Sequence, residues 1–252
     1  MPAGSRVRRL RDAAHTLGVS RLAPSLLRWV VRREFVVFAR DLLVSFPGET
    51  TDPALRWTDL SAQDAARVRE IDPALDEAEL DRLRREGQYC RLGWAGARLA
   101  HYRWDTIRPA YLPYLGRWYQ PQPGDVLTTW LYTAPDDRGQ GVQRASHADL
   151  REQALARGCR RSLGIVAVWN VPSLRTNDHT GRVRVGTVGY VALGPWRRYF
   201  ATGLADFDRD GRVVVSSAQP APSPILPARP GSAPRDARTW AEPAPSDRAA
   251  HR

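Results

Sequence analysis

Blocks of hydrophobic residues along the chain predict the strands of a mixed α/β domain. The β-branched and aromatic run Arg33–Leu42 predicts a first strand. Residues 125–133 are apolar on both faces, as expected of a central strand. A nearly continuous apolar run at residues 163–169 predicts another buried strand, and residues 182–193 predict one or two more. Residues 88–104 predict two strands joined at Ala95-Gly96.

Polar residues with capping chemistry mark three predicted helices. Ser61 is a good N-cap for a helix that extends to Ile71. Asp76 and a glutamate three residues later form a capping-box pattern, and Gly87 ends that helix. A third helix follows the glycines at 139 and 141. Its apolar or small residues recur at spacing four, and it ends at Gly158.

The order of these elements predicts the fold class. A strand at 125–133, a helix from 142 and a strand at 163–169 imply a parallel strand pair with a right-handed crossover. Residues 105–124, rich in proline and tyrosine, are expected to form a loop or short helix near a ligand. Strands and helices mix without strict alternation, so we expect an α/β (α+β) three-layer fold.

Charge and composition predict three regions in the chain. Residues 1–32 are expected to form a basic helical arm, because the first 40 residues hold nine arginines against two acids in a chain of net charge +11. Residues 33–216 form the predicted folded domain. Residues 217–252 are rich in proline and alanine and poor in large apolar residues, which predicts a disordered tail.

Several function classes are disfavoured by what the sequence lacks. It contains no lysine, which excludes a Walker lysine and a Schiff-base lysine. Its histidines show no HExxH spacing, and no G-x-S-x-G pattern occurs. Two cysteines form neither a disulfide framework nor a thiolate metal cluster, so no metal is expected. No apolar run reaches the roughly 18 residues of a membrane-spanning helix, and no signal peptide is apparent, so a cytoplasmic protein is expected.

The stretch from Tyr132 to Ser146 has the chemistry of an anion cradle. Gly139 and Gly141 lie where the predicted strand gives way to the predicted helix, and Arg138 adds a cation. A helix N-terminus presents unpartnered N–H groups and partial positive charge, and glycine lets a phosphate approach the backbone closely. The stretch therefore suits a pyrophosphate, although a simple turn would need the same glycines.

Two patterns in this region resemble the GNAT family of acyl-CoA-dependent N-acyltransferases. The family pattern V-x-P-x-x-R-G-x-G-x-G/A is matched from Thr133 to Gly141, with threonine for valine and Gln143 for the last small residue. The family's next pattern, N-x-x-A/S-I-x-x-Y-x-x-x-G-F, is matched at four positions, namely Asn170, Ser173, Leu174 and Gly181. The family tyrosine is replaced by Asn177, and the phenylalanine after the glycine is replaced by Arg182.

The resemblance implies a GNAT-like three-layer sandwich. Its mixed central sheet would hold a parallel strand pair splayed at the acyl-CoA site. It also implies an acyl-CoA substrate, with acetyl-CoA as the expected donor, whose acyl group moves to an amine by direct attack. The implied cofactor-binding residues are Leu131, Tyr132, Thr133, Arg138, Gly139, Gln140, Gly141, Val142, Gln143, Arg144, Asn170 and Ser173.

The catalytic roles are less well matched by the sequence. An N–H near Trp130 or Leu131 would polarise the thioester carbonyl. His101 is the candidate base for the attacking amine. Asn177 occupies the position of the family tyrosine, which often protonates the leaving thiolate, and asparagine cannot do so. Four tyrosines are possible substitutes, namely Tyr102, Tyr111, Tyr114 and Tyr119.

Three functions therefore stay open on the sequence alone. The first is an acyl-CoA-dependent N-acyltransferase whose amine acceptor is a small amine, an amino sugar or a protein amine. The second is a GNAT-like domain that binds CoA without efficient catalysis, which Asn177 suggests. The third is a basic protein that contacts a membrane or nucleic acid through residues 6–40. A monomer and a homodimer are both compatible with the sequence.

Overall fold

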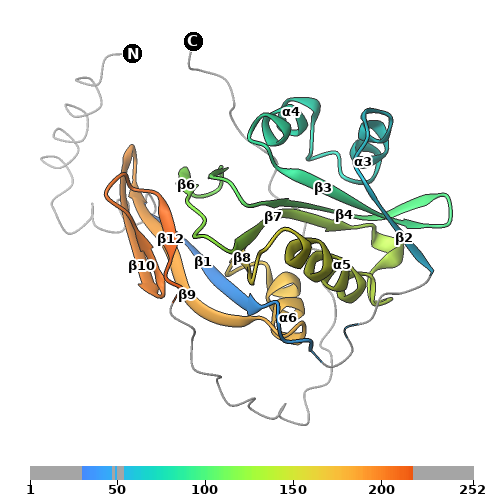
Figure 1. Ribbon diagram of the computed structural model, residues 1–252. Helices are drawn as coiled ribbons and strands as arrows, with labels where there is room; N and C mark the ends of the chain where they lie inside the picture. The colour runs from blue at the N-terminus through green and yellow to red at the C-terminus, as the bar shows by residue number, and fades with distance from the viewer. Residues whose placement is uncertain (1–29, 47–48, 50–53, 218–252) are drawn as a thin grey trace, which may run out of the picture. The chain divides into compact units, whose positions relative to one another are not determined.

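The computed structural model describes residues 30–46, 49 and 54–217 (Figure 1). Its strands are β1 (Val30–Asp41), β2 (Leu55–Asp59), β3 (Tyr89–Ala95), β4 (Arg98–Thr106), β5 (Ala110–Leu112), β6 (Arg117–Tyr119), β7 (Asp125–Thr133), β8 (Arg161–Ala167), β9 (Val183–Leu193), β10 (Trp196–Gly203), β11 (Ala205–Phe207) and β12 (Val213–Val215). Its α-helices are α3 (Ala65–Ile71), α4 (Glu77–Arg85), α5 (Val142–Ala156) and α6 (Val171–His179). The predicted tail from 218 onward and the predicted arm up to residue 29 lie outside the described residues.

Eight strands form one mixed sheet in the order β10-β9-β1-β8-β7-β4-β3-β2. The pair β7 and β8 is parallel, whereas the other printed pairings of this sheet are antiparallel. This confirms the predicted fold class and the predicted parallel pair. The first strand, β1, lies between β8 and β9, a long-range pairing that the local pattern did not predict. It also begins at Val30, three residues before the expected start at Arg33.

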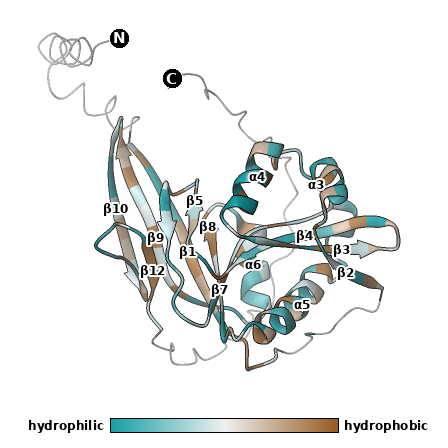
Figure 2. Cartoon of the chain, turned by 45° about the horizontal axis from the view of Figure 1, so that its top comes forward, coloured by the Kyte–Doolittle hydropathy of each residue, from teal (hydrophilic) through white to brown (hydrophobic). Residues whose placement is uncertain are grey.

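Side chains alternate across the sheet and so determine its two covering layers. On β3 and β4, Leu92 and Tyr102 face an apolar cluster that includes Val68 of α3 and Leu83 of α4. On the opposite face, Arg91 and other polar side chains meet α5. Apart from its buried leucines, α4 consists mostly of charged residues, in keeping with a helix at the surface (Figure 2). The sheet is thus the middle of three layers.

A second sheet of four short strands, in the order β11-β12-β6-β5, covers the other half of the face that carries α3 and α4. Its residues Leu112, Tyr119 and Val213 pack with Val37 and Leu163 of the large sheet. The prediction of a loop or short helix at residues 105–124 is therefore wrong. The segment forms β5 and β6 because its alternating apolar residues are buried against the large sheet, which no local signal specifies.

The helix starts follow the predicted capping chemistry. At the start of α4, the Asp76 carboxylate accepts a hydrogen bond of 2.8 Å from the backbone N–H of Glu79. Ser61 and Asp64 form a capping box, but they begin a 3-10 turn at 62–64, so α3 itself starts at Ala65. Gly87, with φ of +71°, ends α4 in the left-handed conformation that favours glycine. Both predicted helices are confirmed.

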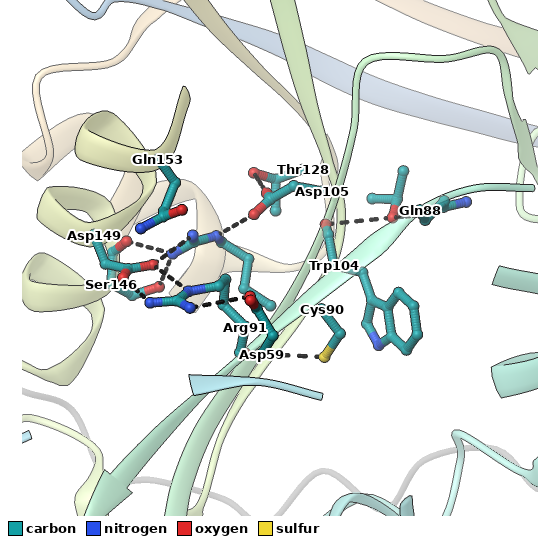
Figure 3. A network of polar contacts seen from close by, with 12 residues as sticks. Asp59, Gln88, Cys90, Arg91, Trp104, Asp105, Thr128, Ser146, Asp149 and Gln153 are labelled. Carbon is teal, nitrogen blue, oxygen red and sulfur yellow. Dashed lines mark hydrogen bonds and ion pairs between the residues drawn. The ribbon is translucent and has the colours of Figure 1, made fainter. Parts of the chain in front are cut away.

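A buried ion network joins α5 to the sheet (Figure 3). Arg103 of β4 is fully buried and donates to Asp105 at 2.6 Å and to Asp149 of α5 at 3.0 Å. Asp149 also accepts from Arg91 of β3 at 2.7 Å. Thr128 of β7 donates to Asp105 at 2.8 Å, so the network spans three strands and a helix. Because every member is paired, the buried charges hold α5 at one position on the sheet.

A β-bulge separates the two halves of β7. Thr128 lies opposite Asp105 and Trp130 lies opposite Trp104, so Thr129 is an extra residue. The parallel ladder with β8 runs from Asp125 to Thr128 and ends there, opposite Gly164. Beyond this rung β7 pairs with β4 and β8 pairs with β1. The two strands are therefore splayed along their remaining length, as the resemblance implied.

We expect Asp149→Asn to destabilise the fold strongly. Losing this carboxylate leaves the two buried arginines Arg91 and Arg103 with Asp105 as the one remaining buried carboxylate of the network. Breaking a buried pair costs about 3–5 kcal/mol. The measurement is the free energy of unfolding in urea. Asp178→Asn is the matched control, since it removes an exposed pair with Arg184 and should change stability by less than about 1 kcal/mol. Equal losses in the two variants would contradict a structural role for the network.

Candidate functional site

A groove of about 620 Å³ opens on the α5 and α6 face of the sheet, beside the splayed end of β7. Its predicted lining residues come from the end of β7, the following loop and the first turns of the two helices. They are Leu131, Tyr132, Thr133, Arg138, Gly139, Gly141, Val142, Gln143, Arg144, Asn170 and Ser173. The structure thus brings together eleven of the twelve predicted cofactor-binding residues. The exception is Gln140, whose side-chain amide donates back to Asp136 O at 2.6 Å.

The loop before α5 presents backbone N–H groups that have no partner among the described residues. These are the N–H groups of Gly139, Gly141, Val142 and Gln143, whereas the N–H of Arg144 donates to Gly141 O at 2.9 Å. Gly139 and Gly141 have φ of +79° and +84°, and a Cβ at either would meet nothing within 4 Å. The glycines therefore serve the backbone conformation and leave the space above it open to an anion.

Two arginines shape this loop. Arg98 of β4 forms a bidentate ion pair with the buried carboxylate of Asp137, which ties the loop to the sheet. Arg138 donates from Nε to Thr133 O at 3.1 Å, and its guanidinium lies 5.4 Å from the centre of the Tyr132 ring. Arg138 is exposed at the groove, so its remaining N–H groups can bind a phosphate.

The pairing of β7 with β4 determines which backbone groups face the splay. Ala134 N–H donates to Ala100 O at 2.9 Å, and Tyr132 lies opposite Tyr102. Since hydrogen-bonded pairs alternate along an antiparallel ladder, Tyr132 and Trp130 direct their backbone groups to β4. Leu131 directs its N–H and C=O toward β8, at the edge that the splay leaves open. Of the two predicted oxyanion donors, Leu131 is therefore the one with the suitable orientation.

The start of α6 forms the opposite wall of the groove. Asn170 caps this helix, since its Oδ1 accepts the N–H of Ser173 at 3.2 Å. The residues of this wall that the sequence did not single out are Pro172, Arg175, Thr176, His179 and Thr180. Helical spacing from Asn170 could have placed some of them on the groove face, but the angle at which α6 meets the sheet depends on tertiary packing.

His101, the candidate base, is fully buried beside the groove. Its Nδ1 lies 2.9 Å from Oγ1 of Thr133, and Trp57 packs edge-on against its ring at 5.8 Å. Burial and the nearby Arg103 lower the pKa of His101 to about 3, so the ring is neutral at physiological pH. Among the described residues its ring nitrogens have one hydrogen-bond partner, the hydroxyl of Thr133, which lines the groove. Its role as a base stays a prediction.

Asn177, at the position of the family tyrosine, is buried and has both ends of its side chain engaged. Its Nδ2 donates to Ser173 O at 2.8 Å, and its Oδ1 accepts from Nη1 of Arg182 at 3.1 Å. It does not line the groove. The substitutions Asn177 and Arg182, which the sequence showed separately, are thus partners in one hydrogen bond.

None of the four tyrosines that the sequence offered as proton donors lines the groove, and two of them have engaged hydroxyls. Tyr102 donates its hydroxyl to the buried Asp72, and Tyr119 lies 3.4 Å from Asp125. Burial raises the pKa of both cysteines, Cys90 and Cys159, which disfavours a thiolate nucleophile. In the part of the chain that the structure describes, no group of three or more His, Cys, Asp or Glu residues could hold a metal ion. Nor does a helix within it have the length and apolarity needed to cross a membrane.

Two buried histidines should make stability depend on pH. His101 and His147 are both fully buried, and desolvation lowers both pKa values below the usual 6.5. The unfolded chain therefore binds more protons below pH 6.5, and stability is lost as the pH falls from 6.5 toward 3. For His101 this loss should be about 2 kcal/mol between pH 7 and pH 5, and His147 should add a loss of the same sign.

Urea unfolding at pH 7 and pH 5 tests this expectation on the wild type and His101→Gln. The variant should lose about 2 kcal/mol less between the two pH values than the wild type does. Equal losses would show that His101 is protonated in the folded protein.

At the sequence level, no known protein family and no curated protein matches the chain. Among solved structures, a functionally unknown conserved protein from Staphylococcus epidermidis is similar with a TM-score of 0.50 at 7% identity, over 70% of this chain and 67% of that one. Aminoglycoside 6'-N-acetyltransferase AAC(6')-Ih from Acinetobacter baumannii aligns with a TM-score of 0.41 at 13% identity, over 50% and 89% of the two chains. Aminoglycoside N-acetyltransferase AAC(6')-Iy in complex with CoA aligns with a TM-score of 0.40 at 17% identity, over 50% and 90%. At such identities, the first of these likenesses concerns the fold alone.

Proposed function

We propose that this protein is an acyl-CoA-dependent N-acyltransferase, with acetyl-CoA as the donor. The observation that carries the proposal is the cluster of unpartnered N–H groups at Gly139, Gly141, Val142 and Gln143. They face a groove that runs beside a splayed parallel strand pair. Such a cluster at a helix N-terminus suits a pyrophosphate, and the open strand edge suits an extended amide-bearing arm.

Each part of the groove would hold one part of the substrate. The pyrophosphate would accept hydrogen bonds from the backbone N–H groups of residues 139 and 141–143. Arg138 and Arg144 would supply positive charge. The pantetheine arm would pair with the open edge of β7, as an added strand does. The N–H of Leu131 would then donate to the thioester carbonyl oxygen and stabilise the negative charge that develops there.

The reaction is a direct transfer. The amine nitrogen bonds to the thioester carbon, the C–S bond breaks with its electron pair on sulfur, and the amine proton passes to water or a base. His101 could accept that proton through Thr133 Oγ1, but with a pKa of about 3 it would not retain it at neutral pH and would pass it on to solvent. No described cysteine thiolate is available, so the acyl group does not pass through an enzyme thiol.

The alternative is a domain that binds acyl-CoA without efficient turnover. The engaged side chain of Asn177 favours it, because the family's usual proton donor is missing. A screen of small amines, amino sugars and peptide amines with acetyl-CoA, read out by released thiol, separates the two. Turnover above the rate without enzyme supports the acyltransferase. CoA binding with no turnover on any amine class supports the binding domain.

CoA should stabilise the folded protein if the loop before α5 binds its pyrophosphate. At a hundred times the dissociation constant the gain is about 2.7 kcal/mol, or roughly 5–10 °C in melting temperature for a domain of this size. Gly141→Val should abolish most of this shift, because its side chain would enter the open space above the backbone.

Gly158→Val is the matched control for that substitution. Gly158 follows the other end of α5 with φ of +76°, and a Cβ there also meets nothing within 4 Å. Both variants carry the strain of a β-branched residue at positive φ, so both should melt lower than the wild type. Only Gly141→Val should lose the CoA-induced shift. A full shift in Gly141→Val, or no shift in the wild type, would mean that the glycines form only a turn.

A further inference from the structure

Arg182 is a buried cation with most of its hydrogen-bonding capacity unused. The residue is 5% exposed and lies between the end of α6 at His179 and the start of β9 at Val183. Its Nη1 donates to Asn177 Oδ1 at 3.1 Å, whereas Nε and Nη2 have no partner among the described residues. No ion pair of Arg182 is found there either, in contrast to the paired Arg40, Arg91 and Arg103 nearby.

Burial of such a group needs an explanation. An unpaired buried charge is unfavourable by several kcal/mol, so proteins rarely keep one without a purpose. Burial is the main cause that lowers the pKa of Arg182 to about 10. The charges of Arg40 and Arg103 lower this pKa further, whereas the carboxylate of Asp105 raises it. The guanidinium therefore remains charged at neutral pH, and the site favours a negative partner.

Gly164 shows where the guanidinium lies. A Cβ built at Gly164 would overlap Nη1 of Arg182, with Asn177 Oδ1 also within 4 Å. Gly164 does not have a positive φ, so its backbone would accept a side chain. The glycine is required here because Arg182 fills the space. Gly164 is also the last β8 residue paired with β7. Arg182 therefore lies at the vertex of the splay, the point where β7 and β8 begin to separate.

The vertex and the groove lie on the same face of the sheet. Leu163 packs on the small-sheet face, so its neighbour Gly164 faces α5 and α6, the helices that line the groove. A substrate arm that starts at the α5 N-terminus and follows β7 from Thr133 toward Thr128 ends beside Arg182. Leu131, the groove residue of β7 nearest this rung, is three residues from Thr128, about 10 Å along the strand, so a thioester reaching past Leu131 would lie between the two.

We propose that Arg182 stabilises the thiolate that CoA becomes when the acyl group leaves. The proposal rests on the proposed function and deepens it. It assigns to Arg182 the place of the phenol that Asn177 lacks. The C–S bond breaks with its electron pair on sulfur, one of the free guanidinium N–H groups donates to the sulfur, and a proton from water later neutralises it. Arg182 keeps its own proton, so its charge acts electrostatically.

A comparison of CoA with desulfo-CoA tests this without knowledge of the acceptor. Calorimetry at pH 7, 8 and 9 gives the two dissociation constants. A cation within hydrogen-bond distance should lower the pKa of the bound thiol by about 1–2. CoA should therefore gain about tenfold in affinity relative to desulfo-CoA between pH 7 and pH 9. Desulfo-CoA controls for the other groups around Arg182, which are Asp105 and Arg103 of β4, Arg40 of β1 and His147 of α5.

Three variants test whether Arg182 causes the pH dependence of the affinity ratio. Arg182→Gln removes the charge and should make the ratio of the two constants independent of pH. Gly164→Ala should do the same, because its methyl group displaces Nη1. Arg184→Gln removes an exposed arginine two residues away, which pairs with Asp178, and should keep the wild-type ratio. If Arg182→Gln does not fold, the comparison of the wild type with Gly164→Ala still tests whether the guanidinium contacts the sulfur.

The outcomes separate the two proposals. If CoA and desulfo-CoA both bind and their ratio stays constant with pH in the wild type, Arg182 does not contact the sulfur, although the groove binds CoA. If the ratio changes with pH as strongly in Arg182→Gln as in the wild type, another group is responsible and the inference is wrong. If neither molecule binds, the proposed function itself is overturned, and the inference with it.

Discussion

The site depends on the point at which β7 stops pairing with β8. The ladder ends at Thr128 and Gly164, and the bulge at Thr129 turns the rest of β7 toward β4. Without that break, the backbone groups of Leu131 would be used in the sheet and the groove would be filled by a strand. The open edge, the exposed loop before α5 and the vertex at Gly164 all follow from this one interruption.

The break requires support, because two splayed strands lose sheet hydrogen bonds. The network of Arg91, Arg103, Asp105 and Asp149 provides that support by tying β3 and β4 to α5. Thr128 donates to the same network at the last paired rung. The helix N-terminus is thereby held relative to the strand edge, and a long substrate needs both at a fixed distance.

Local chemistry in the sequence predicted much of this structure. The capping residue Asp76 located the start of α4, and Ser61 located the 3-10 turn that leads into α3. Apolar runs located the long strands, and the strand–helix–strand order predicted the parallel pair. The two patterns, around Gly141 and around Ser173, located eleven groove residues. Short strands β5 and β6 were missed because only burial against a distant sheet makes them strands. The central place of β1 was missed because pairing between residues 120 to 132 positions apart leaves no local trace.

Arg182 shows why substitutions at a site must be considered together. In the sequence, asparagine for tyrosine at 177 predicts a lost proton donor, and arginine for phenylalanine at 182 is unexplained. In the structure, the smaller Asn177 leaves room for the guanidinium and accepts one of its N–H groups, and the absence of a side chain at Gly164 makes the remaining space. The role of each of these three residues becomes clear only when the other two are considered with it. Together they place a fixed cation at the vertex, at the position where the GNAT pattern has a neutral acid. If the groove binds acyl-CoA as we propose, charge stabilisation would take over where proton donation is absent.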